Sequence, residues 1–174
     1  MIKQKSKQKI YAFIDSQNLN LGVKSQGWNL DFARFLVYLK SKYNVEKAFL
    51  FIGFMAGNTG LYTYLQEAGY ICVFKTVLEI KKGKEIVVKG NVDAELVLHT
   101  MIEYANYSKA IIVSGDGDFH CLVKYLKEKD KLFRLIIPNR KKYSQLFWEF
   151  NPFIAFVDNL KDKLKKREAS PQHG

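Results

Sequence analysis

Cysteine and proline are scarce in this sequence of 174 residues, which holds two of the first and three of the second. Cys72 and Cys121 lie far apart, and neither has another Cys or a His at the spacing of a zinc site. The sequence therefore argues against a zinc site and against a disulfide-stapled scaffold, and it suits a reducing, cytoplasmic compartment. The few prolines exclude a proline-rich linker protein.

Long apolar runs are missing as well. The longest, such as 10–14 and 48–55, fall well short of the ~20 residues that cross a bilayer, so no membrane partner is expected. Residues 1–9 are charged and lack the apolar segment of a secretory signal. Three catalytic motifs are also absent, namely Gly-x-Ser-x-Gly, Walker A and Gly-x-Gly-x-x-Gly.

The sequence is instead rich in apolar and basic residues. Hydrophobic residues make up 48% and aromatic residues 14%, which excludes a disordered chain, and the length suits one domain. The formal net charge is +11, but residues 10–160 hold 19 basic and 15 acidic residues, so much of the excess lies at the ends. We expect a domain over 10–160, a disordered basic tail over 1–9 and a charged tail over 161–174. The positive charge favours a polyanionic partner such as nucleic acid.

Apolar runs of strand length alternate with segments of helical periodicity. Strands are predicted over 10–14, 48–55, 70–74, 110–113, 131–137 and 153–157. Helices are predicted over 30–43, 61–68, 92–107, 119–128 and 143–150. A hairpin with a basic tip is predicted over 77–88, and a charged helix or frayed tail over 159–167. Because apolar strands separated by helices form parallel sheets covered on both faces, this order predicts an α/β fold. The carboxyl ends of the strands then share one edge, where ligands bind.

Carboxylates gather at that predicted edge. Asp15 directly follows the first strand, Asp116 and Asp118 follow a later one, and Asp93 opens a helix. Clustered carboxylates repel one another unless protons or a cation compensate. Oxygen-rich sites suit Mg²⁺ or Mn²⁺, which can activate a water and stabilise the leaving oxygen in phosphodiester hydrolysis. We therefore expect a metal site at this edge.

Each acid also has a purely structural interpretation. An aspartate after a strand is a common helix N-cap, and an aspartate in a first turn is favourable to the helix dipole. Two apolar strands that both end in Asp, one of them followed by Gly115-Asp116-Gly117-Asp118, favour the metal site when taken together. The two glycines would let the backbone turn sharply and keep the metal side open.

Three motifs together resemble the NYN domain, the LabA-like branch of the PIN-like nuclease superfamily. They are Phe13-Ile-Asp15-Ser-Gln-Asn18-Leu19, Lys89-Gly90-Asn-Val-Asp93 with Leu96, and Ser114-Gly-Asp116-Gly-Asp118-Phe119. The resemblance covers roughly residues 10–158. It implies a Rossmann-like three-layer α/β sandwich with a mainly parallel central sheet, a central first strand and a small β-hairpin insertion. The implied activity is metal-dependent cleavage of RNA.

The resemblance also implies roles for single residues. Asn18 would orient a carboxylate or a water, and Ser114 would position a phosphate or a carboxylate. The family often has a further acid at the position of His99, so a neutral imidazole there removes one negative charge; the alternative is a half-buried polar residue on a packed helix. Four acids would be both the catalytic residues and the Mg²⁺ or Mn²⁺ ligands: Asp15, Asp93, Asp116 and Asp118.

Basic residues near the predicted site could contact RNA, either single-stranded or structured. Basic side chains beside an aromatic suit single strands, although an exposed hairpin tip and a solvated loop are the favoured explanations. Trp148 is interpreted as core together with Phe147 and Phe150, and His120 as a helix-surface residue. The RNA-contacting candidates are Lys81, Lys82, Lys84, Lys89, Arg140, Lys141 and Lys142.

Three functions remain open at this stage. The first is an endoribonuclease that depends on Mg²⁺ or Mn²⁺. The second, which His99 favours, is an inactive or weakly active NYN module that binds RNA or a protein. A metal-dependent phosphatase ranks last, because Gln17 stands where phosphoaspartyl phosphatases have a second Asp. A homodimer stays open.

Overall fold

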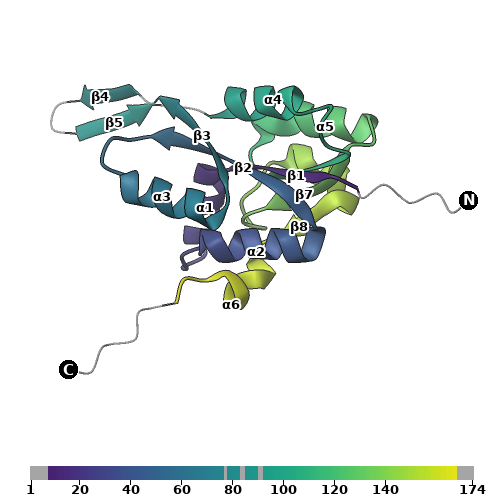
Figure 1. The fold of residues 1–174 in the computed structure, drawn as a ribbon, viewed down its shortest axis with the longest axis horizontal. Coiled ribbons are helices and arrows are strands. Elements are labelled where there is room, and N and C mark those ends of the chain that lie inside the picture. Colours follow the sequence, from purple (N-terminus) through teal and green to yellow (C-terminus); the bar gives the residue numbers. More distant parts are fainter. Residues whose placement is uncertain (1–7, 77, 83–84, 90–91, 168–174) are drawn as a thin grey trace, which may run out of the picture.

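The computed structural model of the chain describes residues 8–76, 78–82, 85–89 and 92–167. Its centre is a six-stranded sheet, in which every neighbouring pair is parallel (Figure 1). The order is β3-β2-β1-β6-β7-β8. These strands are β1 (Ile10–Asp15), β2 (Val45–Phe54), β3 (Ile71–Thr76), β6 (Lys109–Val113), β7 (Leu132–Ile137) and β8 (Ile154–Phe156).

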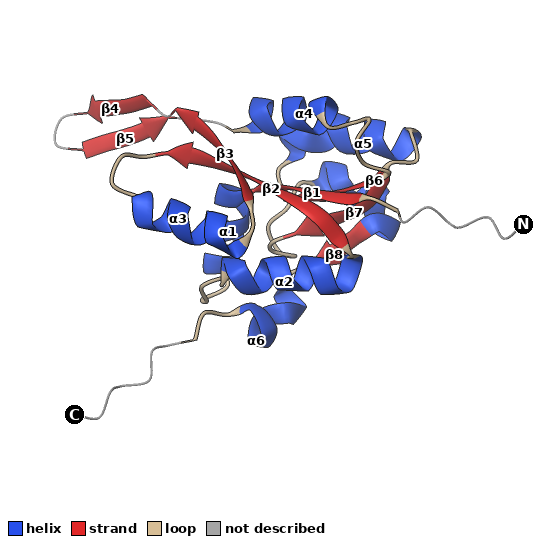
Figure 2. Ribbon diagram, in the orientation of Figure 1, coloured by secondary structure: helices blue, strands red, loops and turns tan. Residues whose placement is uncertain are grey.

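Helices connect the strands, and a separate antiparallel pair extends from the body beyond β3 (Figure 2). That pair is β4 (Leu78–Lys82) and β5 (Glu85–Lys89). The α-helices are α1 (Ser16–Lys24), α2 (Phe32–Tyr43), α3 (Thr59–Ala68), α4 (Asp93–Ile102), α5 (His120–Glu128) and α6 (Lys161–Leu164). Three 3-10 helices are η1 (Gly117–Phe119), η2 (Gln145–Phe153) and η3 (Asp158–Leu160).

Strand β1 explains why the sheet is covered on both faces. All six of its residues are buried, and successive side chains of a strand point to opposite faces. Ala12 and Ile14 pack in the core that α1, α2 and α3 complete, whereas Tyr11 and Phe13 pack in the core that α4, α5 and η2 complete. The predicted three-layer α/β sandwich with a parallel sheet and a β-hairpin is thereby confirmed.

The order of connections creates a crevice beside β1. The chain first builds outward from β1 to β2 and β3, and then returns through the hairpin and α4 to place β6 on the other side of β1. In open parallel sheets, ligands bind outside the carboxyl ends of the strands where the order reverses in this way. The carboxyl ends of β1 and β6 are therefore the place to look for chemistry.

One helix was not predicted, and another is shorter than predicted. Helix α1 was not predicted, because its polar sequence buries only Ser16, Leu19 and Val23. Helix α4 ends at Ile102, whereas helix was predicted to residue 107. The chain turns after α4 so that Tyr107 becomes buried, with its hydroxyl donating to the Thr100 carbonyl over 3.1 Å.

The segment predicted as a helix over 143–150 is the 3-10 helix η2, and this corrects the interpretation of Trp148. Because a 3-10 helix has three residues per turn, Phe147 and Phe150 share one face and are fully buried. Trp148 lies on another face and is 60% exposed, so its placement in the core was wrong.

The C-terminal segment of the described residues packs on the domain. Leu164 is buried, and its carbonyl accepts a hydrogen bond from the Asp31 backbone N–H over 2.8 Å. Lys166 donates its backbone N–H to the Asn29 carbonyl over 2.9 Å. Residues 161–167 thus belong to the packed body, whereas 168–174 and 1–7 of the two predicted tails lie outside the described residues. Within the described residues, no helix has the length and apolar content to cross a bilayer.

Candidate active site

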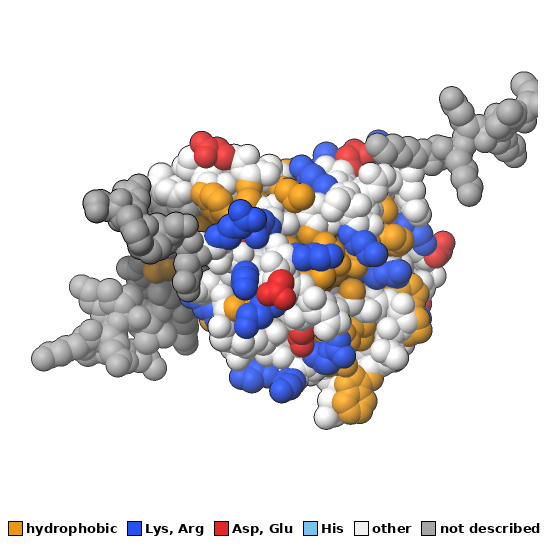
Figure 3. Space-filling model, turned by 90° about the horizontal axis from the view of Figure 1, so that it is seen from below, with side chains coloured by type: hydrophobic (Ala, Val, Ile, Leu, Met, Phe, Trp, Pro, Cys, Tyr) orange, Lys and Arg blue, Asp and Glu red, His pale blue; other side chains and the backbone are white. Residues whose placement is uncertain are grey.

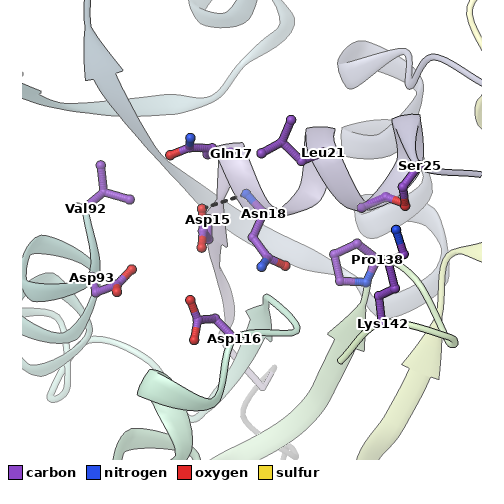
Figure 4. A pocket seen from close by; sticks show the side chains of 11 residues that line it. Asp15, Gln17, Asn18, Leu21, Ser25, Val92, Asp93, Asp116, Pro138 and Lys142 are labelled. Carbon is purple, nitrogen blue, oxygen red and sulfur yellow. Dashed lines mark hydrogen bonds between the residues drawn. The ribbon is translucent and has the colours of Figure 1, made fainter. Parts of the chain in front are cut away.

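A hollow of about 500 Å³ lies at the carboxyl edge of the sheet, beside β1 and β6. Asp15, Asp93 and Asp116 line one end of it, and Pro138 and Lys142 line the other (Figure 4). Asp15 ends β1, Asp93 begins α4 and Asp116 lies in the loop after β6. Three segments that are distant in sequence thus bring carboxylates to the switch point of the sheet, as the strand order requires.

Asp15 is the most buried of these acids, with 5% of its surface exposed. Its side chain caps α1 by accepting the Asn18 backbone N–H over 3.0 Å, and it accepts the Ser114 hydroxyl over 3.3 Å. The pKa of Asp15 is raised from 3.8 to about 6: burial is the largest cause, the negative charges of Asp93 and Asp116 add to it, and the two hydrogen bonds oppose it. Asp15 therefore holds its proton more tightly than an ordinary aspartate.

Asn18 and Ser114 join the two strands of the site. The buried Ser114 hydroxyl, which donates to Asp15, accepts the Asp116 backbone N–H over 3.1 Å. The Asn18 side-chain oxygen accepts the Gly115 backbone N–H over 2.8 Å. These contacts fix the loop after β6 against the end of β1, so both residues position the acidic loop.

A tighter acidic group forms beside Asp15. Asp93, Asp116 and Asp118 each offer a carboxylate oxygen, and these three oxygens lie within 4.8 Å of one another. Asp116 also caps η1 by accepting the Asp118 backbone N–H over 3.0 Å. Two oxygens on opposite sides of a Mg²⁺ ion are about 4.2 Å apart, so small side-chain rotations would suffice for a hard divalent cation. The all-oxygen donor set fits Mg²⁺ or Mn²⁺.

Three acids of the site form no ion pair with a basic side chain of the described residues. These are Asp15, Asp116 and Asp118. On the helix that begins with Asp93, Glu95 forms an ion pair with Lys75 over 3.1 Å. Protons or a bound cation can therefore relieve the repulsion between Asp15, Asp116 and Asp118.

Residues 9–154 of this chain match the NYN domain. The chain belongs to the NYN domain family. It is 26% identical over 128 residues to the "Low amplitude and bright protein LabA" of Synechococcus elongatus, covering 70% of this chain and 69% of that protein. A protein of unknown function from Vibrio parahaemolyticus has a similar solved structure, with a TM-score of 0.75 at 20% identity over 95% of this chain and all of that one. That likeness supports the fold.

Membership in the NYN family is consistent with an acidic group at this edge of the sheet. NYN domains fall in the PIN-like superfamily, whose members are generally nucleases that use divalent metals. The resemblance inferred from the three sequence motifs is therefore confirmed at the level of family and fold. In this NYN domain, all three motifs contribute to one edge of the sheet, since Asp15, Asp93 and Asp116 line the same hollow.

The two glycines of this loop of the NYN domain serve a different purpose from the predicted one. Neither has a positive φ, so sharp turning is not what they provide. A Cβ on Gly115 would lie 3.2 Å from the Tyr143 Cβ, and one on Gly117 would clash with the side chain of Ser144. The glycines therefore allow residues 143–144 to pack closely against the acidic loop.

His99 lies away from the acids in this NYN domain. Six residues after Asp93, it is on a different face of α4. Its ring packs on Phe51, with 5.7 Å between ring centroids, and it is not among the residues that line the hollow. The structure thus places His99 as a half-buried residue on a packed helix, which was one of its two interpretations.

The predicted RNA-contacting residues fall in two places. Lys142 lines the hollow, Lys141 is exposed, and Arg140 lies over the Phe156 ring and 4.0 Å from Asp158. The other candidates come from the hairpin. The structure describes the backbone but not the side chains of Lys81, Lys82 and Lys89, and Lys84 lies outside the described residues.

Sequence reasoning missed other parts of the site. Leu21 of α1 and Ser25, which follows α1, join the predicted Asn18 in a wall of the hollow, and their spacing of three and four residues is the available signal. His120 was interpreted only as a helix-surface residue, whereas its Nε2 lies 2.6 Å from Glu149 Oε1. Because those two residues are 29 apart in sequence, local spacing could not reveal the contact.

Proposed function

We propose that this NYN domain is a nuclease that depends on Mg²⁺ or Mn²⁺ and hydrolyses phosphodiester bonds within RNA strands. The observation that supports it most is the meeting of Asp15, Asp93, Asp116 and Asp118 at the switch point of the sheet. In the described part of the chain, no cationic side chain pairs with three of them, Asp15, Asp116 and Asp118. A cluster of this kind costs folding energy, so a cation that relieves it binds favourably.

Each acid has a place in this proposal. Asp93, Asp116 and Asp118 would hold the ion, since their oxygens already lie within 4.8 Å of one another. When bound, the ion supplies a lowered pKa for a water and neutralises charge on the phosphodiester. Below about pH 6, Asp15 binds a proton while the cluster lacks a cation, and positive charge at the cluster would favour the loss of that proton. Ser114 and Asn18 keep Asp15 and the acidic loop in register.

The charge of the chain as a whole suits a polyanion. The net charge is +11, and on the face seen from below in Figure 3 Lys and Arg side chains are spread widely, with few acids among them. Lys142 lines the acidic hollow itself. A second hollow of about 580 Å³ adjoins the first, and both are lined by Gln17 and Val92. Room on both sides of the acids favours cleavage inside a strand over removal of its end.

The test is RNA cleavage by the purified protein. A labelled RNA is incubated with Mg²⁺, with Mn²⁺ or with a chelator, using the parent, Asp116→Asn and the control Asp162→Asn. Asp162 is an exposed acid on α6, so its replacement makes the same chemical change away from the site. We expect cleavage by the parent and the control only with metal, and a loss of roughly 100-fold or more in Asp116→Asn.

Asp116→Asn is expected to remain folded, because asparagine also caps helices well and one repelling charge is removed. A circular dichroism melt checks this. Equal cleavage by Asp116→Asn and the parent would refute the proposal. RNA binding without metal-dependent cleavage by the parent would favour the inactive binding module instead.

A further inference from the structure

The second hollow lies on the other side of α1 from the acidic one. It is bounded by α1, by the end of β2 and by α3, and Lys166 of the C-terminal segment closes part of it. The residues that line it include no acid, whereas Lys24 and Lys166 supply positive charge. Its chemistry is therefore opposite to that of the neighbouring hollow, with which it shares Gln17 and Val92.

Helix α1 acts as the ridge between the two hollows. Asn18, Leu21 and Ser25 are spaced three and four residues apart and face the acidic hollow. Asn20 and Lys24, four residues apart, face the second hollow. The two hollows meet at the N-terminus of α1, next to Asp15, so a strand that crosses there enters both.

The second hollow combines amides with apolar walls. Amide side chains come from Gln17, Asn20, Asn29 and Asn58, which can each donate and accept hydrogen bonds. Asn58 occupies the N-cap position of α3 but makes no side-chain capping bond, so its amide is not consumed by the helix. Met55 and Leu61 are exposed at 36% and 42% and supply apolar surface.

Hydrogen bonds hold the walls of this hollow in place. The Tyr62 hydroxyl accepts the Met55 backbone N–H over 2.8 Å, which fixes the loop between β2 and α3. The Tyr64 hydroxyl donates to Asp31 over 3.0 Å and accepts the Ala33 backbone N–H over 3.1 Å. A site with walls held in this way loses less entropy when a ligand binds.

We propose that the second hollow binds one unpaired nucleobase of the strand whose backbone crosses the acidic group. This rests on the proposed function, because the acids define where the strand crosses. The base lies against Met55 and Leu61, the amides of Asn20 and Asn58 bond its edge, and Lys24 contacts a neighbouring phosphate. Flipped or unstacked bases are bound in general by apolar side chains on their faces and hydrogen bonds at their edges.

The occupant is a single strand rather than a duplex. Bases in a duplex are stacked and paired, and their edges are not free to enter a hollow between two helices. Single strands present unstacked bases, and their backbone requires positive charge beside the stacking surface. Lys24 and Lys166 lie in the same hollow as the apolar walls, which matches this pairing of charge and apolar contact.

The experiment is an abasic scan of a short, labelled, single-stranded oligoribonucleotide. A series of strands, each lacking one base at a successive position, is bound to the parent and to Asn20→Ala/Asn58→Ala, and affinity is measured by fluorescence anisotropy in chelator and in Mg²⁺. We expect one position at which loss of the base weakens binding to the parent by roughly tenfold. The same base should matter less than about twofold in the variant.

The matched control is Asn106→Ala, an exposed asparagine at the opposite edge of the sheet that bonds Glu103. It is expected to give the parent's profile. A scan without a sensitive position, an equal loss in the parent and in Asn20→Ala/Asn58→Ala, or no binding of any strand would each overturn the base site. A sensitive position in chelator together with no cleavage in metal would uphold the base site while the nuclease proposal fails.

Discussion

The two hollows on either side of α1 divide charge between them. The acidic hollow gathers Asp15, Asp93 and Asp116, whereas the second hollow has no acid among its lining residues and two lysines. Both lie at the carboxyl edge of the same sheet and share a border at Gln17 and Val92. A position near the strand ends therefore does not by itself decide the charge of a hollow. That charge depends on which side chains of α1, α3 and α4 line it.

The difference separates two tasks that a nuclease must perform. Carboxylates that attract a divalent ion also repel the phosphates of the substrate, so the affinity for the strand has to come from elsewhere. Lys24 and Lys166 in the second hollow can supply that attraction without neutralising the acids. Replacing single side chains on the two sides should therefore affect turnover and binding differently.

The largest expected effect is on the acidic side. Asp93→Asn should lower RNA cleavage by about 100-fold, because it removes the negative charge of one of the three carboxylates that face one another. Glu95→Gln on the same helix is the control: Glu95 pairs with Lys75 and contributes no oxygen to the group, so cleavage should change less than about twofold. Initial rates in Mg²⁺ measure both. Equal losses in the two variants would mean that charge on α4 in general, rather than the acidic group, matters.

The pH dependence of stability isolates Asp15. Because its pKa is raised from 3.8 to about 6, the folded protein binds the proton more tightly than the unfolded chain, and the free energy of unfolding falls as pH rises through this window. Urea titrations of metal-free Asp15→Asn and the parent should agree near pH 4. Near pH 7 the variant should be more stable by roughly 2 kcal/mol. A gap that is constant over this range would contradict the account, and Mg²⁺ should narrow the gap by stabilising the parent.

The loop after β6, beside the acidic hollow, is closely packed, whereas the first turn of α3, beside the second hollow, is not. Gly117→Ala should destabilise the protein by about 1–2 kcal/mol in urea unfolding, because the new methyl meets Ser144. Gly60 lies in the first turn of α3, and nothing lies within 4 Å of a Cβ there. Gly60→Ala should be neutral or stabilising by up to about 0.5 kcal/mol. Equal destabilisation by both substitutions would show that the acidic loop is not especially tight.

The smallest expected effect concerns the charge of the second hollow. Lys24→Glu should weaken binding of single-stranded RNA about threefold to fivefold at moderate salt and reduce the salt dependence of affinity. Lys42→Glu changes the same charge on α2, outside the residues that line either hollow, and should weaken binding less. Anisotropy titrations at several salt concentrations test the difference. Identical salt slopes for the two variants would argue that only net charge attracts the strand.

Much of the fold could be predicted because its central strands are short apolar runs. The six residues of β1 are all buried, so no solvent-facing alternation obscured the strand. Helix α1 was missed because its mean polarity resembles that of a loop, and only tertiary burial of Leu19 and Val23 reveals its face. Trp148 was wrongly placed in the core because the segment forms a 3-10 helix with three residues per turn, and nothing in the sequence indicated that helix type.

The candidate site was only partly predictable for a related reason. Asp15 ends β1, and Asp116 and Asp118 lie in the segment that follows the adjacent strand β6, so knowledge of the sheet was enough to expect them together. The second hollow joins Asn20, Asn58 and Lys166, whose positions depend on how α1, α3 and the C-terminal segment pack. Contacts between such distant segments carry no local pattern, and only the folded chain displays them.

Calorimetric titration of metal-free protein with Mn²⁺ tests the acidic group most directly, since it requires no substrate. The parent and Asp162→Asn should bind Mn²⁺ with the same affinity and release protons near pH 6, as Asp15 ionises. Asp93→Asn/Asp116→Asn should bind at least about tenfold more weakly. An identical isotherm for the parent and the double variant, or no binding by the parent, would contradict the claim that these carboxylates form a divalent-metal site.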